Sequence, residues 1–163
     1  KDEGYVKYIG YSIYNFEELN ELYFKFKPDI VQIPGNIFDQ RFFTSGWVQK
    51  LYDEDVLIFL RSIFLQGLLL LPSHKLPNQF LTWKPLWINL DNWLKNNNLS
   101  ALEACLNFFL NDNRIFKIIV GVENKSQLQE ILNIKKKNID YPNWMNNNDE
   151  KLLNPSLWKI TNN

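Results

Sequence analysis

The apolar residues of this chain follow two patterns that alternate along its length. Short, nearly continuous apolar runs predict strands at residues 5–10, 30–33, 56–60 and 116–120. Longer stretches with apolar positions three and four residues apart predict helices at residues 16–26, 45–53, 86–94, 101–109 and 124–132, with a short one at 149–153. Strands that alternate with helices pair in parallel through right-handed crossovers, so the pattern predicts an α/β fold.

Polar residues mark where several of these helices begin. Ser100 and Glu103 form a capping box in front of a helix whose apolar positions follow i, i+3, i+4, i+7 and i+8 without exception. Asn15 and Asn124 each precede a Glu or Gln by three residues, which is a variant of the same signal. Pro28 ends the first helix and opens the next strand.

The strand at residues 30–33 carries one amide, Gln32, and breaks at Pro34 and Gly35. Its near-continuous β-branched residues fit a parallel strand that is covered on both faces, so Gln32 is expected to be buried. A buried amide needs hydrogen-bond partners, which are either neighbouring backbone groups or a ligand with a complementary donor and acceptor. Both interpretations remain open at this point.

Composition narrows the class of protein. The 163 residues suffice for one domain, and 18 Lys and Arg balance 18 Asp and Glu, so neither nucleic acid nor a membrane is an expected partner. The most apolar stretch, residues 59–72, contains Arg61, Ser62 and Gln66 and is too short to span a bilayer. A single cysteine and the lack of a secretory signal predict a cytoplasmic protein without disulfides or a metal site. Because the first residue is Lys1, we expect the chain to lie inside a longer protein.

Four strand–helix units amount to half of a (β/α)₈ barrel, which typically needs about 250 residues. A curved sheet of four strands would leave two edges unpaired and one face of its core exposed. The strand count therefore raises the question of what completes the sheet.

Four ordered motifs, each at the end of a predicted strand, carry a resemblance to a known family. They are residues 10–13 (GYSI), 31–32 with 36–39 (VQ and NIFD), 61–69 (RSIFLQGLL) and 121–127 (GVENKSQ). In order and spacing they resemble the second half of an aldo-keto reductase, over about residues 4–132. The resemblance implies an α/β chain that forms the C-terminal half, strands 5–8 with their helices, of a (β/α)₈ TIM barrel. Residues 1–134 would form this half and residues 135–163 a C-terminal tail that packs on the barrel.

The resemblance also implies a cofactor, NADPH or NADH, bound in extended form across the mouth of the barrel without a glycine-rich fingerprint. Ser12 and Gln32 would hold the nicotinamide carboxamide. Arg61 stands where the family usually has a tyrosine that stacks on the nicotinamide, and a guanidinium plane can also stack on a ring. The remaining implied cofactor residues are Ser62, Phe64, Gly67 and Leu69 in the loop that wraps the pyrophosphate, with Gly121, Glu123, Asn124 and Gln127 at the adenosine end.

Three positions depart from the family pattern. Ile13 and Ile131 occupy positions where the family usually has asparagines that meet the carboxamide and the adenine. Glu123 occupies the position of the Arg or Lys that pairs with the 2′-phosphate of NADPH. A carboxylate near 4 Å from a phosphate is repelled by about 1 to 4 kcal/mol at a protein surface. Glu123 therefore favours NADH over NADPH, or weakens cofactor affinity.

No catalytic residue is expected in this chain, because the family's catalytic Asp, Tyr, Lys and His come from the first half of the barrel. His74 lies in a proline-bounded loop and is expected to be exposed, and Cys105 is expected to be a core residue. The resemblance thus predicts part of an oxidoreductase that reduces a small carbonyl substrate, an aldehyde, ketone or sugar, with a missing N-terminal half supplying catalysis. The alternative is a non-catalytic barrel module that serves binding or assembly, which the substitutions at Ile13, Arg61, Glu123 and Ile131 would permit.

Overall fold

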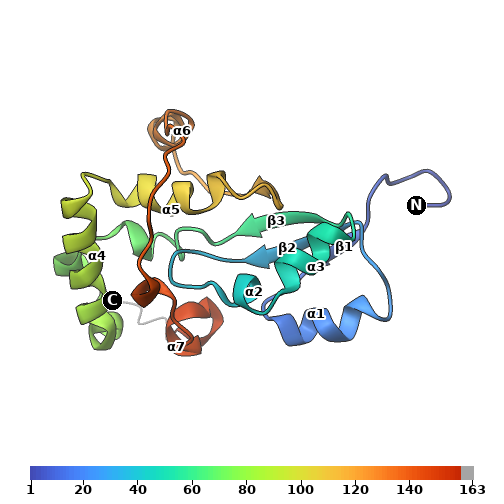
Figure 1. Cartoon of the computed structure of the whole chain (residues 1–163), viewed down its shortest axis with the longest axis horizontal. Coiled ribbons are helices and arrows are strands. Elements are labelled where there is room, and N and C mark those ends of the chain that lie inside the picture. The colour runs from blue at the N-terminus through green and yellow to red at the C-terminus, as the bar shows by residue number, and fades with distance from the viewer. Residues whose placement is uncertain (159–163) are drawn as a thin grey trace.

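The computed structural model describes residues 1–158. Four strands form one parallel sheet in the order β1-β2-β3-β4. The strands are β1 (Gly10–Ser12), β2 (Ile30–Pro34), β3 (Leu57–Arg61) and β4 (Ile115–Ile118). The predicted α/β fold with a parallel sheet is confirmed, and it is consistent with part of a (β/α)₈ barrel. In Figure 1 the strands point toward α4, so their carboxyl ends face that helix.

Within residues 1–158, seven α-helices lie between and after the strands. They are α1 (Phe16–Tyr23), α2 (Arg41–Thr44), α3 (Trp47–Asp53), α4 (Lys84–Asn96), α5 (Ala101–Leu110), α6 (Lys125–Leu132) and α7 (Glu150–Leu153). The described part of the chain also has five short 3₁₀ helices, at Leu68–Leu70, Ser73–Lys75, Asn78–Trp83, Asn143–Met145 and Pro155–Leu157. Every predicted helix is present, whereas α2 and the 3₁₀ helices were not predicted.

The predicted capping signals act as expected. The side chain of Asn15 accepts a hydrogen bond from the Glu18 backbone N–H, and Asn124 accepts one from the Gln127 backbone N–H. Ser100 forms the full capping box at the start of α5. Each of these bonds satisfies a backbone donor that the first turn of a helix leaves unpaired.

The first strand is not where the alternation predicted it. Residues 5–9 lie outside the sheet and Tyr5 is 85% exposed, whereas pairing begins at Gly10, opposite Ile30. A Cβ on Gly10 would lie 1.9 Å from the carbonyl oxygen of Ile30, so only glycine allows the two strands to approach this closely. Among residues 5–9, Ile9 accepts hydrogen bonds from the backbone N–H groups of Asp29 and Ile30, whereas residues 5–8 make no backbone hydrogen bond to β2, so their alternation does not become a strand. The strand predicted at 56–60 lies one residue later, at Leu57–Arg61, and the strand predicted at 116–120 begins one residue earlier and ends two residues earlier, at Ile115–Ile118.

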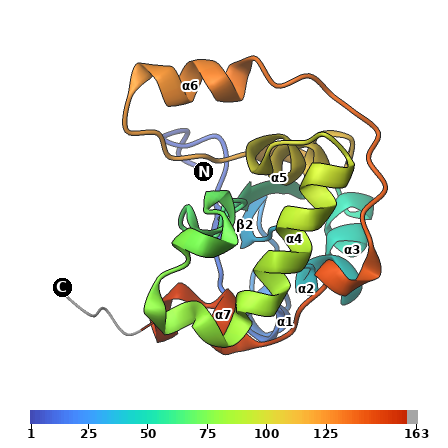
Figure 2. The same cartoon turned by 90° about the vertical axis from the view of Figure 1, so that its left-hand side faces the viewer.

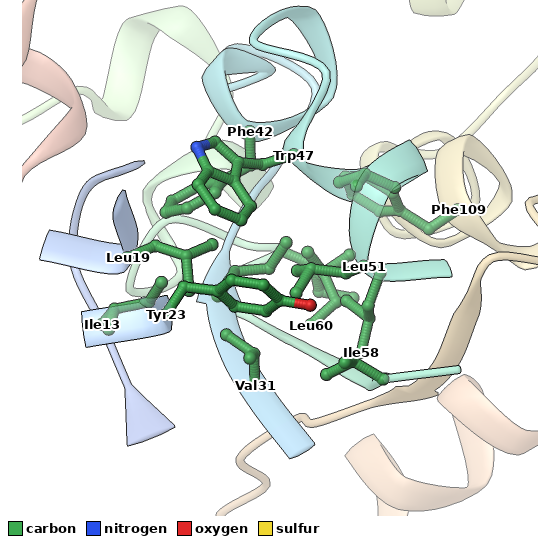
Figure 3. Close-up of a cluster of buried hydrophobic side chains, with 14 of the residues drawn as sticks. Ile13, Leu19, Tyr23, Val31, Phe42, Trp47, Leu51, Ile58, Leu60 and Phe109 are labelled. Atoms are coloured by element: carbon green, nitrogen blue, oxygen red, sulfur yellow. The ribbon is translucent and has the colours of Figure 1, made fainter. Parts of the chain in front are cut away.

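The sheet buries one face under helices and leaves the other partly open. Val31, Ile33, Ile58 and Leu60 are fully buried, whereas the residues between them, including Gln32, are only half-buried. The prediction of a strand covered on both faces, with a buried Gln32, was therefore wrong. The reason is that the described chain covers the second face only in part. Figure 3 shows the buried face, where residues from the strands meet Leu19, Tyr23, Phe42, Trp47, Leu51 and Phe109.

A second buried cluster lies beyond the carboxyl ends of the strands. It joins the loop after β3, represented by Leu65, to Trp87 of α4 and to Cys105 of α5. Met145 and Leu152, which follow α6, are also buried in it. Cys105 is a core residue as predicted, and burial raises the pKa of its thiol to about 12. The last five residues of the predicted tail, 159–163, lie outside the described residues.

Candidate functional site: a groove beside the carboxyl ends of the strands

A groove of about 870 Å³ lies between the loop after β3, the start of α5, the end of β4 and α6. Figure 2 shows α6 standing apart from α5 on this side of the molecule. Seven of the predicted cofactor residues line the groove: Arg61, Ser62, Phe64, Gly67, Gly121, Glu123 and Gln127. Ligands of parallel α/β sheets bind outside the carboxyl ends of the strands, and this volume lies within the range of small-molecule sites. The groove is therefore the candidate functional site.

The loop at residues 62–67 forms one wall and has a strained backbone. Three of its non-glycine residues have positive φ: Ser62 at 64°, Leu65 at 47° and Gln66 at 55°. Each such residue costs roughly 1–2 kcal/mol relative to the right-handed region, and strain of this kind gathers at ligand sites. Gly67 also has a positive φ, of 83°, while the space around it is open, so backbone conformation rather than crowding favours glycine there. Burial of Leu65 in the second cluster holds the loop in this shape.

Ser12 and Gln32 lie side by side on adjacent strands, beyond one end of the groove. They are paired in the register of β1 and β2, and the Ser12 hydroxyl donates to Oε1 of Gln32 over 3.3 Å. Ser12 is exposed and Gln32 is half-buried. The amide nitrogen of Gln32 makes no hydrogen bond to other residues within 1–158. This pair therefore combines an internal hydrogen bond with a donor that a ligand could use.

Arg61 ends β3 and lies between that pair and the groove. Its Nη2 donates to the carbonyl oxygen of Ile13 over 3.0 Å, and its Nη1 donates to Oγ of Ser62 over 3.2 Å. The guanidinium also lies over the ring of Tyr14, 4.6 Å from its centroid. These contacts fix the orientation of the half-buried guanidinium. Tyr14 was not identified from the sequence, because no local pattern indicates which residue meets a strand end 47 positions away.

The far end of the groove is acidic and is organised by the start of α6. Asn124 caps the helix, and the side chain of Gln127 accepts a hydrogen bond from the Glu123 backbone N–H over 2.8 Å. Both amides are thus engaged in starting the helix. Glu123 and Glu130 line the groove with exposed side chains. Arg61 is the one cation among the lining residues, and it lies at the opposite end.

The structure does not bring every predicted residue into the groove. Ser12, Gln32, Leu69 and Asn124 are not among its lining residues, and the Leu69 side chain is fully buried in the second cluster. The start of α5, at residues 100–102, lines the groove but was not predicted, because its place beside the β3 loop arises only from the packing of α5. Gln66, Leu70 and Glu130 also line it and were not predicted.

Ile13 and Ile131, which stand where the family usually has asparagines, and His74 lie in three different environments. The Ile13 side chain is buried in the first cluster, so only its carbonyl group reaches Arg61. Ile131 is half-buried and lines the groove. His74 is exposed in the 3₁₀ helix Ser73–Lys75, as predicted.

The start of α5 is held by a carboxylate whose ionisation should affect stability. The Lys137 ammonium, 2.7 Å from Glu103, and the Ser100 backbone N–H lower the pKa of the Glu103 carboxyl to about 2. Because this folded pKa lies below the ordinary value of 4.5, the stabilisation is complete above pH 4.5 and is lost as the pH falls toward 2.

We therefore expect the urea midpoint of unfolding to decrease when the pH is lowered from 4.5 to 2.5. This decrease should be smaller in Glu103→Gln than in wild type. Urea unfolding of both proteins across this range measures the difference. Glu130→Gln, which changes an exposed carboxylate on α6, serves as the control, and its urea midpoint should depend on pH as that of wild type does. If the urea midpoints of wild type and Glu103→Gln decrease equally with pH, the ionised Glu103 carboxylate does not stabilise the protein.

Residues 1–158 contain no cluster of three or more His, Cys, Asp or Glu side chains placed to hold a metal ion. Within the same residues, no helix combines the length and the apolar character needed to cross a membrane. The groove offers a ligand a volume of about 870 Å³ lined by both apolar and polar side chains.

The sequence was compared with models of known protein families and with curated proteins. A family model described as "Aldo/keto reductase family" matches residues 1–145, which is most of the chain. No curated protein sequence matches the chain.

Proposed function

Because this chain belongs to the aldo/keto reductase family, we propose that it contributes the nicotinamide-cofactor site of an NAD(P)H-dependent oxidoreductase that reduces a small aldehyde, ketone or sugar. The observation that supports this most is the convergence of seven residues of the family motifs on one groove at the carboxyl ends of the strands. These residues come from the loop after β3 and the segment after β4, which lie far apart in the sequence.

The residues around the groove suit an extended dinucleotide. At one end, Ser12 and the half-buried amide of Gln32 can offer the nicotinamide carboxamide both a donor and an acceptor. In the middle, the strained loop at 62–67 presents its backbone to the groove. At the other end, residues 121–127 at the start of α6 would meet the adenosine. The cofactor, when bound, supplies the hydride.

We propose that an N-terminal barrel half supplies the proton donor and completes the sheet. β1 and β4 are each paired on one side only within the described residues, so both have an edge free for a further parallel strand. Two apolar residues of the open face, Phe59 and Phe116, stack with ring centroids 5.8 Å apart, and Phe116 is 53% exposed. Additional strands would bury this surface. In this proposal, residues 1–134 are the C-terminal half of the barrel and residues 135–163 are its tail.

A non-catalytic binding module is the second candidate, and two observations favour it. The buried Ile13 side chain offers nothing to a carboxamide, and the Arg61 guanidinium already stacks on the Tyr14 ring. The protein, expressed at its native length, should be titrated with NADH and NADPH while the fluorescence of the reduced nicotinamide is followed. The absence of a signal with both cofactors would overturn the reductase proposal.

The same titration tests the role of Glu123 in cofactor preference. We expect wild-type protein to bind NADH more tightly than NADPH, because the carboxylate repels the 2′-phosphate. Glu123→Arg is expected to raise NADPH affinity about fivefold or more and to leave NADH affinity nearly unchanged, since about 1 kcal/mol corresponds to that factor. Glu17→Arg, on α1 and outside the groove, makes the same charge change and should have no effect. An unchanged NADPH affinity in Glu123→Arg would contradict the assignment while leaving the cofactor site itself in place.

A further inference from the structure

We infer that Arg61 is an anion-binding residue, which takes a phosphate or carboxylate group at the β3 end of the groove. The inference deepens the proposed function and rests on it only for the identity of the ligand, which is either a cofactor phosphate or a negatively charged carbonyl substrate. The binding of an anion as such follows from the surroundings of Arg61.

Arg61 is the one arginine of the chain without a carboxylate partner among residues 1–158. The other two arginines each bind the aspartate two residues before them: Nε of Arg41 lies 2.9 Å from Asp39, and Nη2 of Arg114 lies 2.6 Å from Asp112. Arg61 instead donates to two neutral oxygens, a backbone carbonyl and a serine hydroxyl. A guanidinium has five N–H donors and is always charged, so three donors and the full positive charge remain available.

The guanidinium is oriented before any ligand arrives. The hydrogen bonds to Ile13 and Ser62 and the stacking on Tyr14 hold it from the segments that follow β1 and β3, which reduces the conformational entropy lost when an anion binds. The two residues after Ser62 supply further donors, because the backbone N–H groups of Ile63 and Phe64 donate to no acceptor among residues 1–158. A fixed guanidinium beside free backbone donors is suited to two oxygens of one phosphate or carboxylate.

The charges along the groove select the position of the anion. Arg61 lies at one end, whereas Glu123 and Glu130 lie at the other. An anionic group is therefore attracted to the β3 end and repelled from the α6 end. The groove therefore suits a ligand whose negative charge lies near the ends of β1 and β3 better than it suits a neutral ligand.

The first experiment measures anion binding without a cofactor. The protein at its native length is titrated with inorganic pyrophosphate by calorimetry at low ionic strength. We expect Arg61→Gln to weaken binding tenfold or more and Arg61→Lys to weaken it less, because lysine keeps the charge but loses the planar fork. Lys95→Gln, an exposed position on α4, removes one positive charge elsewhere and should bind like wild type. Equal affinities of wild type and Arg61→Gln, or no binding to wild type, would overturn the inference.

The second experiment distinguishes the two sources of the anion. A tenfold weaker binding of NADH to Arg61→Gln would assign the site to a cofactor phosphate. An unchanged NADH affinity, with a loss of kcat/KM for glyceraldehyde 3-phosphate but not for glyceraldehyde, would assign it to a charged substrate. Unchanged NADH affinity with equal losses for both aldehydes would contradict the inference. If pyrophosphate binding depends on Arg61 while neither NADH nor NADPH binds, the reductase proposal fails and the anion site stands.

Discussion

Replacing Trp87 by alanine is expected to lower the free energy of unfolding by about 3–5 kcal/mol. The Trp87 side chain is fully buried in the second cluster, and its ring meets Phe38 edge-on at 5.2 Å between centroids. Its Nε1 donates to the buried carbonyl oxygen of Leu68 over 3.3 Å. The substitution therefore leaves a large cavity and also removes the partner of a buried acceptor. Urea unfolding at pH 7 measures the loss.

Trp87→Phe separates the two contributions. Phenylalanine keeps much of the ring but cannot donate to Leu68, so we expect a loss of about 1–3 kcal/mol. Because Leu68 directly follows the strained loop at 62–67, both variants should also weaken binding of pyrophosphate at the groove. A loss below 1 kcal/mol for Trp87→Ala would show that α4 contributes little to the stability of this part of the fold.

The second large effect is expected at Arg41, where Arg41→Met should cost about 3–5 kcal/mol. The Asp39 side chain is 1% exposed and receives hydrogen bonds from Nε and Nη2 of Arg41, at 2.9 and 3.0 Å. Methionine fills a similar volume but leaves this carboxylate buried without its cation. The pair holds the loop after β2, and Arg41 also reaches Glu150 of α7 at 3.4 Å, so the loss should loosen both segments.

Two further variants make this prediction specific. The double variant Asp39→Asn with Arg41→Met removes the buried charge together with its partner, and it should therefore be more stable than Arg41→Met alone. Arg114→Met breaks a similar pair with Asp112 at a more exposed position, and about 1 kcal/mol or less is expected there. If the double variant is no more stable than Arg41→Met, the cost does not come from the unpaired Asp39 carboxylate.

Local signals in the sequence account for most of the elements. The starts of α1, α5 and α6 were predicted because Asn15, Ser100 and Asn124 bond to backbone groups three residues away, and such bonds depend only on neighbouring residues. The parallel order of the sheet followed from the alternation of strands and helices. Residues of the motifs after β3 and β4 line one groove, and their role in binding a cofactor stays a prediction.

Features that depend on distant neighbours were predicted poorly. β1 begins at Gly10 because its backbone must approach Ile30, which no alternation of residues 5–9 reveals. Gln32 is half-buried because the amount of cover over one sheet face depends on elements elsewhere in the chain. α2 has neither a side-chain cap nor a long apolar pattern, so its four residues carried no signal.

By itself, the sequence determined the α-helices other than α2 and the parallel pairing of the strands, because periodicity and capping act within a few residues. Only the tertiary structure decided which residues share the groove and with what charge. It placed Arg61 against Ile13 and Tyr14, with no carboxylate of residues 1–158 in an ion pair with it, and placed Glu123 and Glu130 on the α6 side of the groove. Such contacts join segments that are tens of residues apart, and packing rather than local propensity selects them.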